Sequence, residues 1–209
     1  MSNRERVSEN IHRLSDTCNV YLVQDGRRGV LIDFGAGRAL DQVDELGTTE
    51  ISRVLVTHHH RDQVQGLQRA ADAGIEIWVP PVEQALIHHI DAHWQARAIE
   101  NNYDVREDRF SLLGSVPITG TVSEYLPMRI GRRSFTPIPT PGHTIGSVSY
   151  LATIDGQRVA FTGDLIYAPG KIWSLAATMW SYAELPGVAS TILSLLALRA
   201  ERPDPLTST

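Results

Sequence analysis

The chain has 209 residues, of which 42% are hydrophobic and 21% are charged. This is long enough to bury one sizeable core, and we expect a single domain over residues 1–209. A formal net charge of -5 leaves no basic footprint of the kind that holds a phosphate backbone, which argues against nucleic acid as a partner. No stretch approaches the roughly 20 apolar residues of a membrane span, so we expect no membrane partner either.

Cysteine usage and the N-terminal sequence indicate the compartment. Cys18 is the one cysteine, so no internal disulfide can form. The N-terminal stretch MSNRERVSENIHRL lacks the apolar run that a signal peptide needs. We therefore expect a soluble protein of a reducing compartment, the cytoplasm.

Strand and helix patterns alternate in the first half of the chain. Strands are expected where short apolar runs are bounded by turn residues, and helices where apolar residues recur every three to four positions. In chain order, these are strands at 20–23 and 29–34, a helix at 40–46, a strand at 52–58, a helix at 63–74 and a strand at 75–80. Such alternation predicts an α/β fold.

The second half returns to strands after a less regular stretch. A helical pattern runs from 81 to about 103, and residues 104–133 read as irregular. Strands and turns then occupy 134–167, with Asp155-Gly156 as a hairpin signal. A last helix is expected at about 185–200, closed off by Pro203.

The motif HHHRDQ, residues 58–63, comes directly after the strand at 52–58. Where the chain is extended, residues two apart point the same way, so His58, His60 and Asp62 can converge. Two imidazoles and a carboxylate on one side suit zinc or iron. The alternative is a solvated surface cluster of histidines, because a local motif alone has a real false-positive risk.

Two polar residues far along the chain also lie at strand ends. PTPGHTIGS places His143 in a turn between strands, and VAFTGDL places Asp164 immediately after an apolar strand. Loops on a rigid scaffold commonly carry function. Each residue has an ordinary alternative, namely a turn histidine with local hydrogen bonds and a turn or N-cap aspartate. All of them together in one short chain favour a metal site.

Taken in order, NVYLV…LIDFG, VTHHHRDQ, TPGHTIGSVSY and FTGDLIY resemble the metallo-β-lactamase superfamily, in particular its glyoxalase II-like and lactonase-like members. The resemblance covers about Asn19 to Asp204 and implies an αββα sandwich with a metal site at the sheet edges. It implies one or two ions, with zinc as the expected metal and iron or manganese as alternatives. The implied ligands are His58, His60 and His143 for a first metal, and Asp62 with the residue at position 63 for a second, Asp164 bridging the two.

The chain departs from the family pattern in two places. Position 63 is histidine in the family, whereas Gln63 here offers an amide oxygen, a weaker and neutral ligand. The family also has a final histidine after the last helix, and no histidine follows His143 in this sequence. We therefore expect the second metal position to be weakened and the closing C-terminal elements to be missing from this chain.

The resemblance implies a hydrolase that attacks a small ester, thioester or lactone with a metal-bound hydroxide. Asp62 would hold the water and pass its proton to the leaving group. Tyr167 matches a tyrosine that lactone-cleaving members place beside the substrate carbonyl, where it could steady an oxyanion. An aromatic-rich segment at 173–182 could line an apolar pocket, or be ordinary core.

Two other classes of function remain open. Two histidines and an aspartate also suit non-haem iron, and the family resemblance includes persulfide dioxygenases and diiron oxygen reductases. A non-catalytic protein with a degenerate metal site is the third possibility, motivated by Gln63 and the absent last histidine. The sequence does not determine the oligomeric state.

Overall fold

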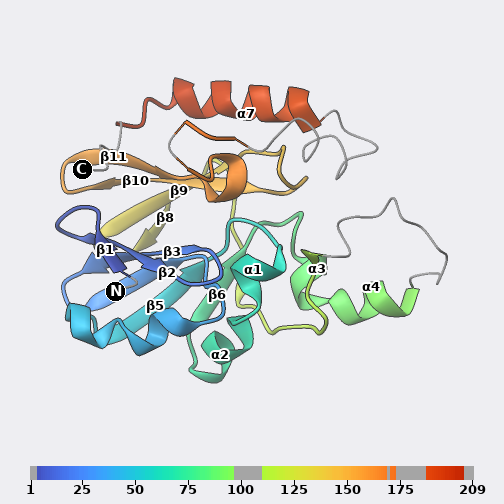
Figure 1. The fold of residues 1–209 in the computed structure, drawn as a ribbon, viewed down its shortest axis with the longest axis horizontal. Coiled ribbons are helices and arrows are strands. Elements are labelled where there is room, and N and C mark those ends of the chain that lie inside the picture. The colour runs from blue at the N-terminus through green and yellow to red at the C-terminus, as the bar shows by residue number, and fades with distance from the viewer. Residues whose placement is uncertain (1–3, 97–109, 169, 173–186, 205–209) are drawn as a thin grey trace.

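The computed structural model describes residues 4–96, 110–168, 170–172 and 187–204. Two β-sheets lie face to face, with α7 (Gly187–Ala200) over the outer side of one sheet and helices α1 to α4 beyond the other (Figure 1). The layers are therefore helix, sheet, sheet, helix, which confirms the predicted αββα sandwich. The aromatic-rich segment at 173–182 lies outside the described residues.

The two sheets differ in strand direction. In the seven-stranded sheet, β1 to β4 pair with one another antiparallel, and β4 to β7 pair with one another parallel. The four-stranded sheet is antiparallel throughout. The larger sheet contains β1 (Arg4–Arg6), β2 (Ile11–Ser15), β3 (Asn19–Asp25), β4 (Arg28–Ile32), β5 (Glu50–Leu55), β6 (Glu76–Val79) and β7 (Gly120–Thr121). The smaller sheet contains β8 (Met128–Ile130), β9 (Arg133–Pro139), β10 (Val148–Ile154) and β11 (Gln157–Phe161).

Alternating side chains of single strands build the separate layers of the core. On β4, Val30 and Ile32 pack between the two sheets, while Leu31 packs between the larger sheet and its helices. On β10, Tyr150 faces the other sheet, and Leu151 lies in the cluster beneath α7. Burying one such aliphatic side chain contributes about 1.5–3 kcal/mol, so both faces of the inner strands stabilise the stack.

The helices differ most from the sequence-based expectation. The helix expected at 40–46 is two 3-10 turns, η1 (Arg38–Asp41) and η2 (Asp44–Leu46). The helix expected at 63–74 is split into α1 (Arg61–Val64) and α2 (Leu67–Asp72) at Gly66, where a Cβ atom would lie 2.4 Å from the carbonyl carbon of Ala36. The expected helix from 81 is, within its described part, two short helices, α3 (Ala85–His88) and α4 (Ile90–Ala96). Among the described residues, no helix has the length and apolar character needed to cross a bilayer.

Two other segments also depart from expectation. Strands β1 and β2 precede the first expected strand, and the segment read as irregular contributes β7 and β8. The hairpin signal is confirmed, because Asp155 and Gly156 join β10 to β11 with φ values of 54° and 77°. Both residues need the left-handed region, which Asp and Gly tolerate.

The carboxyl ends of three parallel strands meet at one edge of the larger sheet. Asp33 follows β4, the histidine motif follows β5, and Glu83 follows β6. The smaller sheet brings the β9–β10 loop with His143, and Asp164 after β11 in the 3-10 turn η3 (Gly163–Leu165). Ligands of open α/β sheets bind beyond the carboxyl ends of the strands, so this edge is where a site is expected.

Candidate metal centre

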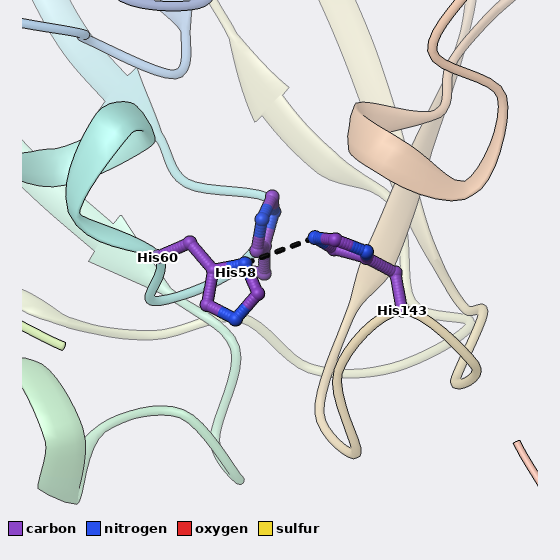
Figure 2. A group of neighbouring side chains, drawn as sticks. All are labelled: His58, His60 and His143. Carbon is purple, nitrogen blue, oxygen red and sulfur yellow. Dashed lines mark hydrogen bonds between the residues drawn. The ribbon is translucent and has the colours of Figure 1, made fainter. Parts of the chain in front are cut away.

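Three histidine rings from two loops converge beyond the ends of the strands. One potential ligand atom from each of His58, His60 and His143 lies within 4.8 Å of the others, and Figure 2 shows the rings pointing toward one another. The Nε2 atom of His143 is 2.9 Å from Nδ1 of His60. The ring of His143 also meets those of His58 and His60 edge-on, with centroids 4.9 and 4.6 Å away. The structure thus brings together the three residues that the family resemblance implies as ligands of a first metal.

The chemistry of these three rings fits a divalent cation. Burial, followed by the proximity of the other histidines, holds the pKa values of His58 and His60 well below their usual range. Burial also lowers the pKa of His143, to about 4. The rings are therefore neutral at pH 7, the form in which imidazole binds metals. The Nε2 atom of His58 is buried without a hydrogen-bond partner, as expected of a nitrogen that a metal would satisfy, whereas His60 faces His143 with its Nδ1 atom.

A buried chain of hydrogen bonds orients His58 from behind. The hydroxyl of Thr57 lies 2.8 Å from Oδ2 of Asp33 and 3.0 Å from Nδ1 of His58. Because the hydroxyl donates to the carboxylate, it accepts from the Nδ1–H group, which leaves the lone pair of His58 on Nε2. Burial raises the pKa of Asp33 to about 7 despite its hydrogen bonds to Thr57. This hydrogen-bond network was not predicted from the sequence, although a carboxylate directly after an apolar strand, as in LIDFG, was a usable signal.

Asp164 lies beside the histidines and binds Gln63. Its Oδ2 atom is 3.4 Å from Nε2 of His143, and its Oδ1 atom accepts a 3.1 Å hydrogen bond from Nε2 of Gln63. Burial, reinforced by the charge of Asp62, raises the pKa of Asp164 to about 7, although the hydrogen bond from Gln63 opposes the rise. Gln63 thus uses its amide to hold the carboxylate that the family resemblance makes a bridging ligand.

Asp62 was expected to converge with His58 and His60, but it lies outside the cluster of three histidines and acts on Asp164 through its charge. His60 still has extended backbone angles, but helix α1 begins at Arg61. Strand alternation therefore accounts for the shared direction of His58 and His60, and not for Asp62, which is exposed in the first turn of α1. Partial loss of hydration raises the pKa of Asp62 above its usual range.

His59 stands outside the cluster of three histidines, although its ring meets that of His60 edge-on with centroids 4.9 Å apart, and it contacts a buried carboxylate. Its Nδ1 atom pairs with Oε2 of Glu83, a residue that is 2% exposed. Burial alone would raise the pKa of Glu83, but His59 and the surrounding hydrogen bonds outweigh it and hold the value below the usual range. Glu83 was also not predicted as a site residue, although a carboxylate shortly after a buried strand was an available signal in the sequence.

The aromatic side chain of Phe110 lies beside the histidines at the surface. The ring of Phe110, 45% exposed, has its centroid 5.1 Å from that of His60. Tyr167 is 44% exposed, three residues after Asp164, and its backbone N–H donates to the carbonyl of Lys171 at 3.2 Å. Phe110 was not singled out from the sequence, whereas Tyr167 was.

Comparison with known proteins assigns the family. Residues 15–206 match the model of the metallo-beta-lactamase superfamily, so the chain belongs to that superfamily. This confirms the predicted family.

The named relatives are of low identity. A hydroxyacylglutathione hydrolase of Albidiferax ferrireducens is 27% identical over 72% of this chain and 48% of its own length. A probable metallo-hydrolase of Bacillus subtilis, YqgX, is 26% identical over 72% of this chain and 66% of its own length. The chain thus spans about half the length of the hydroxyacylglutathione hydrolase.

Solved structures share the fold. BJP-1, a subclass B3 metallo-beta-lactamase of Bradyrhizobium japonicum, superposes with a TM-score of 0.70 at 20% identity, covering 95% of this chain and 74% of its own. A metallo-beta-lactamase of Cronobacter sakazakii has a TM-score of 0.65 at 21% identity, covering 93% and 75%. The motif by which the Cronobacter protein is described, HARLDQ, ends in the same Asp-Gln pair as HHHRDQ here.

Proposed function

We propose that this chain is a metal-dependent hydrolase of a small ester, thioester or lactone, with zinc held by His58, His60 and His143. The observation that carries the proposal is the convergence of three buried, neutral imidazoles whose ligand atoms lie within 4.8 Å of one another. Zinc commonly takes three protein ligands in catalytic sites and leaves a fourth position for water or substrate. The thioester class is supported by a relative described as an atrochrysone carboxyl ACP thioesterase, of Passalora fulva, 28% identical over 73% of this chain and 39% of its own length.

Bound zinc would supply two things: a water that ionises near neutral pH, and a positive charge that polarises the substrate carbonyl. The proposed role of Asp62 is to accept the proton of the attacking water and return it to the leaving group, for which its raised pKa is suited. Tyr167 is the proposed oxyanion donor, with a side chain open to solvent and so to a substrate. Neither role requires a serine or cysteine nucleophile.

We further propose one principal metal position and a weak second one. A second ion would draw on Asp62, Gln63 and Asp164, but Gln63 turns its amide N–H toward Asp164 at 3.1 Å. An amide in that orientation stabilises the carboxylate by a hydrogen bond instead of offering a lone pair to a cation. Asp164 is then available to the single metal or to its water.

The test is the metal content of the chain, measured by elemental mass spectrometry after purification without chelator or added metal. We expect about one zinc per chain, loss of that zinc in His60→Ala, and retention in His89→Ala, in which an exposed histidine outside the cluster is removed. A panel of aryl esters, acyl thioesters and lactones should show hydrolysis that disappears together with the metal.

Two results would contradict the proposal. Zinc retained by His60→Ala at the level of the unmodified chain would sink the ligand assignment. Stoichiometric iron with oxygen uptake, and no hydrolysis of any ester or lactone, would replace the hydrolase by the redox alternative.

A further inference from the structure

Glu83 lies between the two loops that carry the three histidines. It follows β6 and precedes α3, and its side chain is 2% exposed. Oε2 accepts from the backbone N–H of His59 at 3.1 Å and pairs with the His59 ring. Oε1 accepts from the hydroxyl of Thr144 at 2.7 Å and from the backbone N–H of Gly146 at 2.8 Å. Each carboxylate oxygen therefore accepts hydrogen bonds from a different loop.

The partners of Glu83 are the immediate neighbours of the metal ligands. His59 stands between His58 and His60, so fixing its backbone and its ring fixes the segment from which both ligands project. Thr144 and Gly146 follow His143 in the β9–β10 loop. The two loops extend from different sheets, and the carboxylate joins them beyond the strand ends.

Gly146 shows how closely the second loop approaches this carboxylate. A Cβ atom at position 146 would lie 2.7 Å from Oε1 of Glu83 and 2.7 Å from Cβ of Val82. The loop can donate its backbone N–H to Glu83 because a glycine stands there, and a larger residue would have to push the loop away. The sequence and the contacts thus agree on a tight, buried junction.

We propose that Glu83 is a positioning residue of the metal centre: its carboxylate holds the loop of His58 and His60 at a fixed separation from the loop of His143. This inference rests on the metal site of the proposed function. Groups that orient metal ligands from behind commonly change metal affinity about 10–100-fold when removed. Glu83 positions both ligand-bearing loops, whereas Thr57 orients only the ring of His58.

The substitution Glu83→Gln tests the role with little change of size. An amide offers one acceptor oxygen where the carboxylate offers two, so one of the loops would face an NH₂ group and lose its hydrogen bonds. We expect zinc affinity about 10–100-fold lower, by competition with a chromophoric chelator, and an altered d–d absorption spectrum of the cobalt-substituted protein. Glu76→Gln is the matched control, because it removes a carboxylate from the other end of β6, where its partners are Arg53 and Trp78.

A purely structural role predicts a different pattern. The variant would then unfold at lower temperature with and without zinc, while its folded form kept the zinc affinity and cobalt spectrum of the unmodified chain; that result would overturn the proposal. If Glu83→Gln does not fold, Thr144→Val and Gly146→Ala disturb the same junction with the carboxylate in place. Unchanged zinc affinity in both of these variants would overturn it equally.

The same assay separates this inference from the proposed function. Zinc retained by His60→Ala would refute the metal assignment itself. Zinc lost by His60→Ala but bound normally by Glu83→Gln would leave the metal centre standing and refute only the role of Glu83.

Discussion

Replacing Thr57 by valine removes one hydroxyl from the support of His58 while keeping the shape of the side chain. Thr57 is 1% exposed, and its hydroxyl lies 2.8 Å from Asp33 and 3.0 Å from Nδ1 of His58. In Thr57→Val the buried carboxylate keeps the backbone N–H of residue 57 as a donor, at 2.8 Å, but loses the hydroxyl. The Nδ1–H group of His58 is left without an acceptor.

The expected cost follows from these two hydrogen bonds. A hydrogen bond to a charged group contributes about 1.5–3 kcal/mol, and an unsatisfied buried donor costs about 1–3 kcal/mol. Both lost hydrogen bonds involve the hydroxyl oxygen of Thr57, and the surrounding side chains can relax, so the two costs do not add in full. We therefore expect the free energy of unfolding of the metal-free chain to fall by about 2–3 kcal/mol. Zinc affinity should fall about 10–100-fold, because His58 is no longer held with its Nε2 lone pair toward the site.

Urea unfolding of the metal-free chain and chelator competition for zinc measure the two effects separately. Thr57→Ser is the control, since it keeps the hydroxyl and loses one methyl group, worth about 0.8 kcal/mol. Its zinc affinity should match that of the unmodified chain. If Thr57→Val binds zinc as tightly as Thr57→Ser, the hydroxyl does not orient His58 and the reasoning is wrong.

Three other substitutions test separate features. Gln63→His should raise the metal content toward two ions per chain in elemental analysis, and an unchanged content would show that position 63 does not limit the second site. Gly66→Ala should lower the free energy of unfolding by about 1–3 kcal/mol in urea, because its Cβ would lie 2.4 Å from the carbonyl carbon of Ala36; unchanged stability would contradict the close approach. Burial raises the pKa of Asp155, but hydrogen bonds, including two from Asn10, outweigh it and lower the net value, so its contribution is present above the ordinary carboxylate pKa and lost as pH falls through the lowered one. Because Asp155 is exposed, solvent screens its interactions, and Asp155→Asn should cost about 0.2–1 kcal/mol in urea unfolding at pH 7 and progressively less in acid. An equal cost at pH 7 and in acid would exclude the ionised carboxylate as the cause.

Local periodicity predicted an α/β fold, and the family resemblance implied the αββα order of layers. Apolar residues on both faces of a strand, as in Val30, Leu31 and Ile32, require cover on both sides, and this gives an inner sheet whatever the distant contacts are. The same holds for the hairpin at Asp155-Gly156, whose backbone angles follow from residue type. The proposed metal ligands were also identifiable, because they stand at strand ends in a family-specific order.

The break at Gly66 and the 3-10 turns at 38–46 were decided by tertiary packing. The apolar spacing in both segments suits an α-helix, but the close approach of Gly66 to the turn at Ala36 depends on how two distant segments pack. Local propensity cannot anticipate such an approach, since it contains no information about what lies opposite.

Only the folded chain decided how the site is supported. The bond from Gln63 to Asp164 spans 101 positions, and the bond from Thr144 to Glu83 spans 61. Residue types and strand ends indicate that such groups lie at one edge, but not which donor meets which acceptor, because that depends on how the two sheets are set against each other. The sequence thus indicated the proposed ligands of the metal centre, and the tertiary structure decided which residues hold them in place.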